Sequence, residues 1–185
     1  VHVDRFSVGF GRALYKRIGN NGTEYRLAMI PFGGYVKMRD SREQELTPAM
    51  AVSAFDHKPV GKRFAIVAAG PLANLAMMIG WALVGKLAIS LPASEPAVYL
   101  ALVAEAGIFV NALLMVFNLF PLLPLDGGRI LTGLLPNRLA YAFSRTEPYG
   151  MFILIALILT GILGKFMWPL VELSMKSIYA IIGLS

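Results

Sequence analysis

Two long apolar runs dominate the middle of the chain. Residues 72–91 form a run of 20 whose only charge is Lys86, and residues 107–125 form a run of 19 without any charge. A transmembrane helix needs roughly 20 apolar residues to cross about 30 Å of hydrocarbon. We therefore predict two membrane-spanning helices, separated only by a short loop at residues 92–96.

The pattern after residue 148 leaves more than one interpretation open. Residues 149–164 are apolar over 16 positions, which suits either a short span or a re-entrant element. Residues 166–184 follow with Glu172 and Lys176 inside them, and the path of this last stretch stays open. The expected fold class is a mainly α membrane protein with three to four transmembrane helices.

Before the first apolar run, the pattern becomes typical of β structure. Alternating residues at 14–18, the sequence Asn20-Asn21-Gly22-Thr23 and residues 24–30 predict a hairpin. A second turn at Pro31-Phe32-Gly33-Gly34 leads into residues 35–38. We therefore predict three short strands joined by two turns.

The segment between this β region and the first span is polar. Residues 39–63 carry a cluster of charges at Asp40, Arg42, Glu43 and Glu45, which indicates either a solvated connector near the lipid surface or a mobile linker. Two parts are thus expected: residues 1–63 as a membrane-associated β region with its connector, and residues 64–185 as a transmembrane helical core. The apolar run 29–38 is expected to dip into the membrane face where protein groups satisfy its backbone.

Composition agrees with a membrane protein. The chain is 57% hydrophobic and 15% charged, which is too apolar for an ordinary soluble domain of 185 residues. It has no cysteine, so disulfides and cysteine metal sites are excluded. The net charge of +6 does not indicate nucleic-acid binding, because 11 of the 17 basic residues precede the first span and three more lie between residues 126 and 148. This distribution places residues 1–63 and 126–148 on the cytoplasmic side.

The second apolar run ends in a sequence that no regular helix accommodates. Residues 118–129 read Asn-Leu-Phe-Pro-Leu-Leu-Pro-Leu-Asp-Gly-Gly-Arg, and each proline lacks a donor and clashes with the preceding turn. We expect the helix to unwind here and a functional site to lie at the break. The simplest interpretation of Asp126 is nonetheless an N-cap for a following helix. Asn111 and Asn118 share a helix face, and the simplest interpretation is that they hold helices together.

The ionisable residues alone do not indicate a metal site. His2 and His57 are the only histidines, and they lack the i, i+4 spacing of a helical zinc site. Glu105 has no acidic or histidine partner at ligand spacing and is expected near the outer membrane surface. A three-ligand zinc site cannot be assembled from these residues.

Taken together, three segments resemble the site-2 protease family of intramembrane zinc metalloproteases. Residues 3–11, 23–25 and 30–38, the last including Ile30-Pro31-Phe32-Gly33-Gly34-Tyr35, resemble the membrane-associated β region that follows the family's first helix. Gly70-Pro71-Leu72-Ala73-Asn74 resembles the Gly-Pro-x-x-Asn motif of its second helix, and residues 118–129 resemble its Asn-x-x-Pro…Leu-Asp-Gly motif. The motifs occur in the family's order.

The resemblance implies a function and roles for single residues. Zinc is expected to be held by Asp126 together with two histidines of a His-Glu-x-x-His helix, whose glutamate is the general base. Asn118 is expected to position the substrate or to stabilise the tetrahedral intermediate. Residues 30–35 are expected to bind the substrate as an added strand. The expected substrates are transmembrane proteins, cut near the cytoplasmic side of a lipid bilayer, which the resemblance places as the bacterial inner membrane.

The chain departs from the family pattern in one respect, since it contains no His-Glu-x-x-His. We expect the sequence to begin in mid-protein, after that helix, and the 185 residues alone to bind no zinc stably. The alternative is a non-catalytic scaffold or substrate-binding pseudo-protease of the same fold. The genomic sequence upstream of Val1 distinguishes the two. No PDZ domain fits between the first two spans, and a transporter is not indicated because only one helix break is present.

Overall fold

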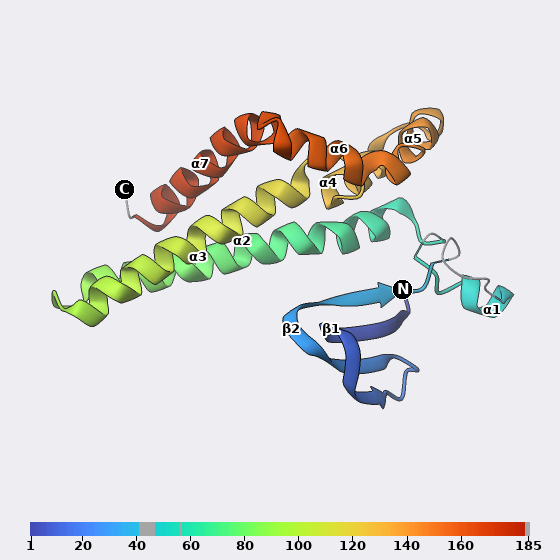
Figure 1. Ribbon diagram of the computed structural model, residues 1–185, viewed down its shortest axis with the longest axis horizontal. Helices are drawn as coiled ribbons and strands as arrows, with labels where there is room; N and C mark the ends of the chain where they lie inside the picture. Colours follow the sequence, from blue (N-terminus) through green and yellow to red (C-terminus); the bar gives the residue numbers. More distant parts are fainter. Residues whose placement is uncertain (41–46, 56, 184–185) are drawn as a thin grey trace. The chain divides into compact units, whose positions relative to one another are not determined.

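The computed structural model describes residues 1–40, 47–55 and 57–183, and for Phe32 and Asn137 it describes the backbone alone. The chain divides into two compact units, Val1–Arg63 and Phe64–Ser185 (Figure 1). The functional description of these units as a membrane-associated region and a transmembrane core stays a prediction. The predicted charge cluster at Arg42, Glu43 and Glu45 lies outside the described residues.

The first unit contains a small sheet of two long strands, β1 (Val3–Ile18) and β2 (Glu24–Met38), and the short helix α1 (Pro48–Ala51). The predicted hairpin turn is confirmed: Gly22 has a φ of +80°, and its N–H donates to the carbonyl of Gly19 over 2.9 Å. The predicted division of residues 24–38 by a second turn is wrong, because these residues form one strand. Gly33 at φ +95° bends this strand without ending it.

The two strands fold back on themselves. The first part of β1, residues 3–8, pairs with the end of β2, residues 34–38, along one side and with its start, residues 24–27, along the other. The last part of β1, residues 13–18, pairs with the remaining side of residues 24–28. β1 bends at Gly9 and Gly11, where φ is +88° and +82°, values that side chains other than glycine rarely adopt. Residues 34–38 therefore form one edge of the sheet within the described part of the chain, and residues 13–18 form the other.

Part of the segment after β2 packs onto the sheet. The prediction of a solvated connector or mobile linker is therefore wrong for Arg39 and residues 53–55, whereas residues 47–50 and 59–62 are exposed. Arg39 donates to Asp4 Oδ1 over 2.9 Å from Nη2, and to Ser53 Oγ over 3.0 Å from Nη1. The N–H of Phe55 donates to the carbonyl of Arg39 over 2.7 Å, and Ala54 is fully buried. These contacts fold residues 47–55 back against the ends of both strands.

The second unit is helical. Its elements are α2 (Val60–Ser90), which begins in the first unit, α3 (Glu95–Leu119), α4 (Asp126–Leu134), α5 (Asn137–Ser144), α6 (Glu147–Leu159) and α7 (Ile162–Ile182). Most of each predicted span is helical, since α2 contains residues 72–90 and α3 contains residues 107–119, whereas residues 120–125 are not helical. Each helix begins earlier than predicted, so Pro71 lies inside α2 and not at its start. The predicted apolar stretch 149–164 is divided between α6 and α7 by Gly161 in a left-handed conformation.

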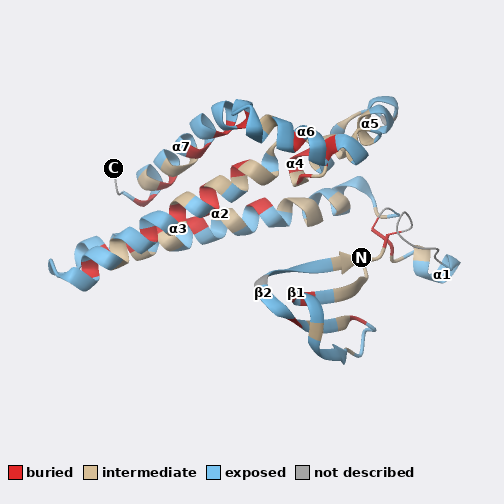
Figure 2. Ribbon diagram, viewed as in Figure 1, coloured by how far each residue is buried: buried red, intermediate tan, exposed pale blue. Residues whose placement is uncertain are grey.

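α2 and α3 are long and apolar enough to cross a membrane by length and composition, and α5 with α6, bent by 63°, forms a third candidate span or a re-entrant element. Only 17% and 28% of the residues in the apolar windows of α2 and α3 are buried within the chain, and Figure 2 shows most of the helical surface exposed. A surface this apolar suits lipid as its solvent. The mainly α fold with a small β region is thus confirmed, and the described residues contain two or three candidate spans where three to four were predicted.

Small residues bring the helices together. A β-carbon at Gly107 on α3 would overlap the indole ring of Trp81 on α2, and the β-carbon of Ala104 lies 3.4 Å from the position of one built at Gly85. α7 packs along α3 through Leu163, Met167, Val171 and Ile178, all of which are buried. The Nζ of Lys86 donates to the carbonyl of Ile182 over 2.6 Å and so links α2 to the carboxyl end of α7.

Candidate functional site

The helix break predicted from the two prolines is present. α3 ends at Leu119, α4 begins at Asp126, and the Leu123–Pro124 peptide bond is cis. Two short hydrogen bonds hold the intervening turn: Leu122 N–H donates to the carbonyl of Phe120 over 2.8 Å, and Leu125 N–H donates to that of Leu122 over 2.9 Å. The backbone freed by the prolines is thus partly satisfied within the break.

Two glycines let α4 begin directly against this turn. A β-carbon at Gly127 would overlap the carbonyl of Leu119, and one at Gly128 would lie 2.5 Å from the amide of Leu123. Asp126 is the first residue of α4, and its N-cap is Leu125, without a side-chain cap. The interpretation of Asp126 as an N-cap is therefore wrong by one position, because the turn carries extended backbone as far as Leu125.

The carboxylate of Asp126 lies against the start of the Gly-Pro-x-x-Asn sequence. A β-carbon built at Gly70 would lie 3.0 Å from Asp126 Oδ2. Asp126 is half-buried and lies outside both candidate spans, and burial raises the pKa of its carboxyl group while the charge of Arg129 partly opposes that rise. Gly70 and Asp126, which belong to separate motifs and lie 56 positions apart in the sequence, thus meet at one carboxylate.

The other residues of these two motifs have different surroundings. Pro71 is buried in α2, and Asn74 is half-buried one turn further on. Asn118 is half-buried in the last turn of α3, and within the described part of the chain its side chain makes no hydrogen bond. Asn111 is buried and donates from Nδ2 to the carbonyl of Gly107 over 2.8 Å, so it bonds its own helix and not a neighbour. Asn118 therefore remains a candidate for binding a ligand.

The described residues do not form a complete metal site on their own. No group of three or more His, Cys, Asp and Glu side chains that could hold a metal ion occurs among them. A protein zinc site needs three or four such ligands. Asp126 fits as a single carboxylate ligand, because it is half-buried and faces a glycine that leaves room beside it.

The predicted substrate-binding residues lie at the bend and edge of β2. Ile30 is 45% exposed and Tyr35 is 36% exposed, and Pro31 is exposed as well. Gly33 makes the bend, with Phe32 beside it, and a β-carbon at Gly34 would overlap the carbonyl of Ser7. The two glycines thus have a role in the sheet itself, whereas Ile30 and Tyr35 leave side chains open for contact.

Charged side chains gather on the sheet beside Tyr35. Glu24 accepts from Arg26 Nε over 2.7 Å and from Arg5 Nε over 3.1 Å, and Arg5 Nη1 donates to the Tyr35 hydroxyl over 3.4 Å. Arg26 and then Arg5 hold the pKa of Glu24 below its ordinary value, and Arg5 lowers the pKa of Tyr35. Charge alternation in the sequence did not indicate this network, which forms because the folded strands bring residues 5, 24 and 35 together.

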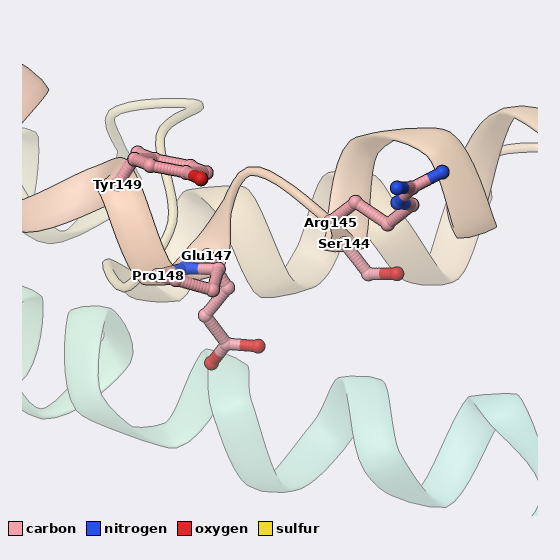
Figure 3. A pocket seen from close by; sticks show the side chains of 5 residues that line it. All are labelled: Ser144, Arg145, Glu147, Pro148 and Tyr149. Carbon is pink, nitrogen blue, oxygen red and sulfur yellow. The ribbon is translucent and has the colours of Figure 1, made fainter.

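A shallow pocket of about 570 Å³ lies at the junction of α5 and α6. It is lined by Ser144, Arg145, Glu147, Pro148 and Tyr149 (Figure 3). The labelled side chains diverge, with the Glu147 carboxylate directed away from Arg145 and Tyr149. Ser144 Oγ donates to its own helix, at the carbonyl of Tyr141. Because its polar groups do not converge, this pocket does not form a site comparable with Asp126.

Comparison with known proteins gives a family and several relatives. The family model "Peptidase family M50" matches residues 1–161. The regulator of sigma-E protease RseP of Salmonella typhimurium strain 14028s is 53% identical over 79 residues, which is 43% of this chain and 18% of that protein. RseP of Escherichia coli K12 matches to the same extent. A proposed zinc metalloprotease of Vibrio cholerae is 48% identical over 79 residues, again 18% of its length. The matched part thus spans about a fifth of these relatives.

Proposed function

The chain belongs to peptidase family M50, the site-2 protease family, and from this premise we propose that it forms part of an intramembrane zinc metalloendopeptidase that cuts transmembrane proteins. The observation that carries the proposal is the half-buried carboxylate of Asp126, presented at a helix break against Gly70. Relatives named as zinc metalloproteases support zinc as the metal.

In this proposal Asp126 would supply one zinc ligand, and the others would be two histidines of a His-Glu-x-x-His motif, which these 185 residues do not contain. Zinc in such a site acts as a Lewis acid and lowers the pKa of bound water to about 7. The residues of this chain bind and orient the substrate. Asn118, half-buried just before the break and without a partner among the described side chains, binds the substrate backbone. The apolar faces of α2 and α3 keep bulk water from the peptide bond.

The edge of β2 receives the substrate in extended form. A peptide bond in a helix is shielded, so the substrate must unfold locally before cleavage, and strand addition satisfies its backbone. Residues 34–38 are an edge among the described residues. The side chains of Tyr35, within this edge, and of Ile30, before it, are exposed and open for contact.

The charge distribution supports an orientation in a bacterial inner membrane. Eleven basic residues lie in residues 1–63 and three in residues 126–148, against a single charge, Glu95, in residues 92–96. By the positive-inside rule the first two segments lie on the cytoplasmic side. The substrate is then cut near that side.

The test uses the product of the complete gene in lipid nanodiscs. Asp126→Ala is expected to lower bound zinc from one per chain to below about a tenth, because a three-ligand site loses a ligand, and to abolish cleavage of a transmembrane substrate. Glu172→Gln is the control, since it removes an exposed carboxylate that, among the described residues, pairs with Lys176 alone, at 3.7 Å. One tightly bound zinc in Asp126→Ala would contradict the proposal. A complete protein that binds a substrate helix without zinc or cleavage would instead be a pseudo-protease.

A further inference from the structure

The start of α6 lies directly against the helix break. A β-carbon at Gly150 would overlap the carbonyl oxygen of Leu123 and lie 3.2 Å from Cδ of Pro124. Gly150 and Leu123 are both buried. Backbone therefore touches backbone here, and only glycine allows the approach.

Glycine at this position needs a reason, because it is unfavourable inside a helix. Gly150 is the fourth residue of α6. Gly164 on α7 and Gly80 on α2 show the contrast, since a β-carbon at either would meet no atom within 4 Å. Of these three helical glycines, only Gly150 has a neighbour so close that it leaves no space for a β-carbon.

A second contact joins α6 to α4, on the other side of Asp126. Arg129 Nη2 on α4 lies 3.7 Å from Glu147 Oε1 at the start of α6. Both side chains are about 40% exposed, so this pair contributes less than the buried contact at Gly150. Together the two contacts hold the break on both sides of Asp126.

The backbone of the helix break is held tightly, so a shift of Leu123 is passed on to Asp126. Leu125, just before Asp126, is buried, and its N–H bonds the carbonyl of Leu122 over 2.9 Å. Gly128 packs against Leu122 and Leu123 from the other side. A displacement of Leu123 must therefore move Asp126 relative to Gly70.

We infer that Gly150 is a positioning residue that sets the place of the Asp126 carboxylate through Leu123 and Pro124. The contact of Gly150 with Leu123 and Pro124 is independent of any catalytic activity. Only its importance for metal binding rests on the proposed function. Glu147 contributes to the same positioning through Arg129.

The test measures the exposure of position 126 without zinc or cleavage. The chain has no cysteine, so Asp126→Cys is a unique thiol whose alkylation by N-ethylmaleimide reports access in lipid nanodiscs. This reporter is combined with Gly150→Ala, and with Gly164→Ala as the matched control. A second reporter, Ala82→Cys, lies at a fully buried position of α2 and reports general loosening.

We expect Gly150→Ala to raise alkylation at position 126 roughly tenfold, the scale of an overpacked contact, with no change at position 82 and none for Gly164→Ala. An unchanged rate at position 126, or a parallel rise at position 82, overturns the inference. If Gly150→Ala does not accumulate, Glu147→Gln must raise the rate at position 126 about twofold, as loss of an exposed ion pair allows, and no rise overturns it. Neither result depends on whether the complete protein is a protease.

Discussion

Gly70 on α2 faces the carboxylate of Asp126 on α4, so closely that a β-carbon added at Gly70 would lie 3.0 Å from Oδ2. This contact joins two of the three segments by which the chain resembles its family, and because Gly70 has no side chain, none crowds the carboxylate on that side.

The first prediction concerns this contact. Gly70→Ala is expected to displace the Asp126 carboxylate by a few tenths of an ångström and to lower the zinc affinity of the complete protein roughly tenfold, in the range seen when a ligand's surroundings are altered. Zinc competition with a chelator measures the change. Gly80→Ala, on the same helix with open space around it, is the control and should leave the affinity unchanged.

The second prediction concerns the sheet edge proposed to bind the substrate. Successive N–H groups of a strand point to opposite sides, so of Tyr35 and Val36 one donates toward β1 and the other toward the open edge. Proline at the first position breaks pairing with β1, and proline at the second removes a donor from the open edge. We expect the outward variant to lose substrate cleavage while circular dichroism stays unchanged. Proline at Tyr15 and Lys16, on the opposite edge, is the comparison. Equal loss of cleavage at both edges would argue against strand addition at residues 34–38.

The third prediction concerns helix packing. Gly107→Ala places a methyl group in the ring of Trp81 and should destabilise the protein by about 1–3 kcal/mol. Thermal unfolding in detergent measures this. Gly164→Ala should be neutral or slightly stabilising, because it adds a good helix former where space is open. A Gly107→Ala variant as stable as the wild type would show that the two helices separate easily there.

The fourth prediction concerns pH. Arg26 and Arg5 hold the pKa of Glu24 below its ordinary value of 4.5, so the folded state favours the charged carboxylate. The resulting stabilisation is present above the unfolded pKa and is lost as pH falls through the folded one. Glu24→Gln should therefore reduce the loss of sheet stability below about pH 4.5, measured by tyrosine fluorescence during acid titration. An identical acid profile for wild type and variant would count against this account.

The fifth prediction concerns Lys86. Lys86→Met removes the donor to the carbonyl of Ile182, and the last turn of α7 should then exchange its amide hydrogens about tenfold faster, as expected for loss of one charged hydrogen bond. Hydrogen exchange with mass spectrometry in nanodiscs resolves this turn. Lys165→Met, an exposed change at the other end of α7, should leave it protected.

Local chemistry determined much of this protein from the sequence alone. Length and apolarity predicted helices at α2 and α3, and the spacing of Pro121 and Pro124 predicted the helix break, because a missing donor and a ring clash act on the nearest turn whatever surrounds them. Asn21-Gly22 predicted the hairpin turn for a similarly local reason.

Contacts between distant residues were decided only by the tertiary structure. Gly33 looked like part of a turn, yet pairing with β1 keeps β2 continuous through it. Pro71 suggested a helix start, yet the helix runs through it from Val60. Which glycines are needed depends on what approaches them, as Gly70 and Gly150 show beside Gly80 and Gly164. Contacts between residues that are distant in the sequence produce no repeating pattern in it. The position of Asp126 depends on such contacts, so only the tertiary structure shows it.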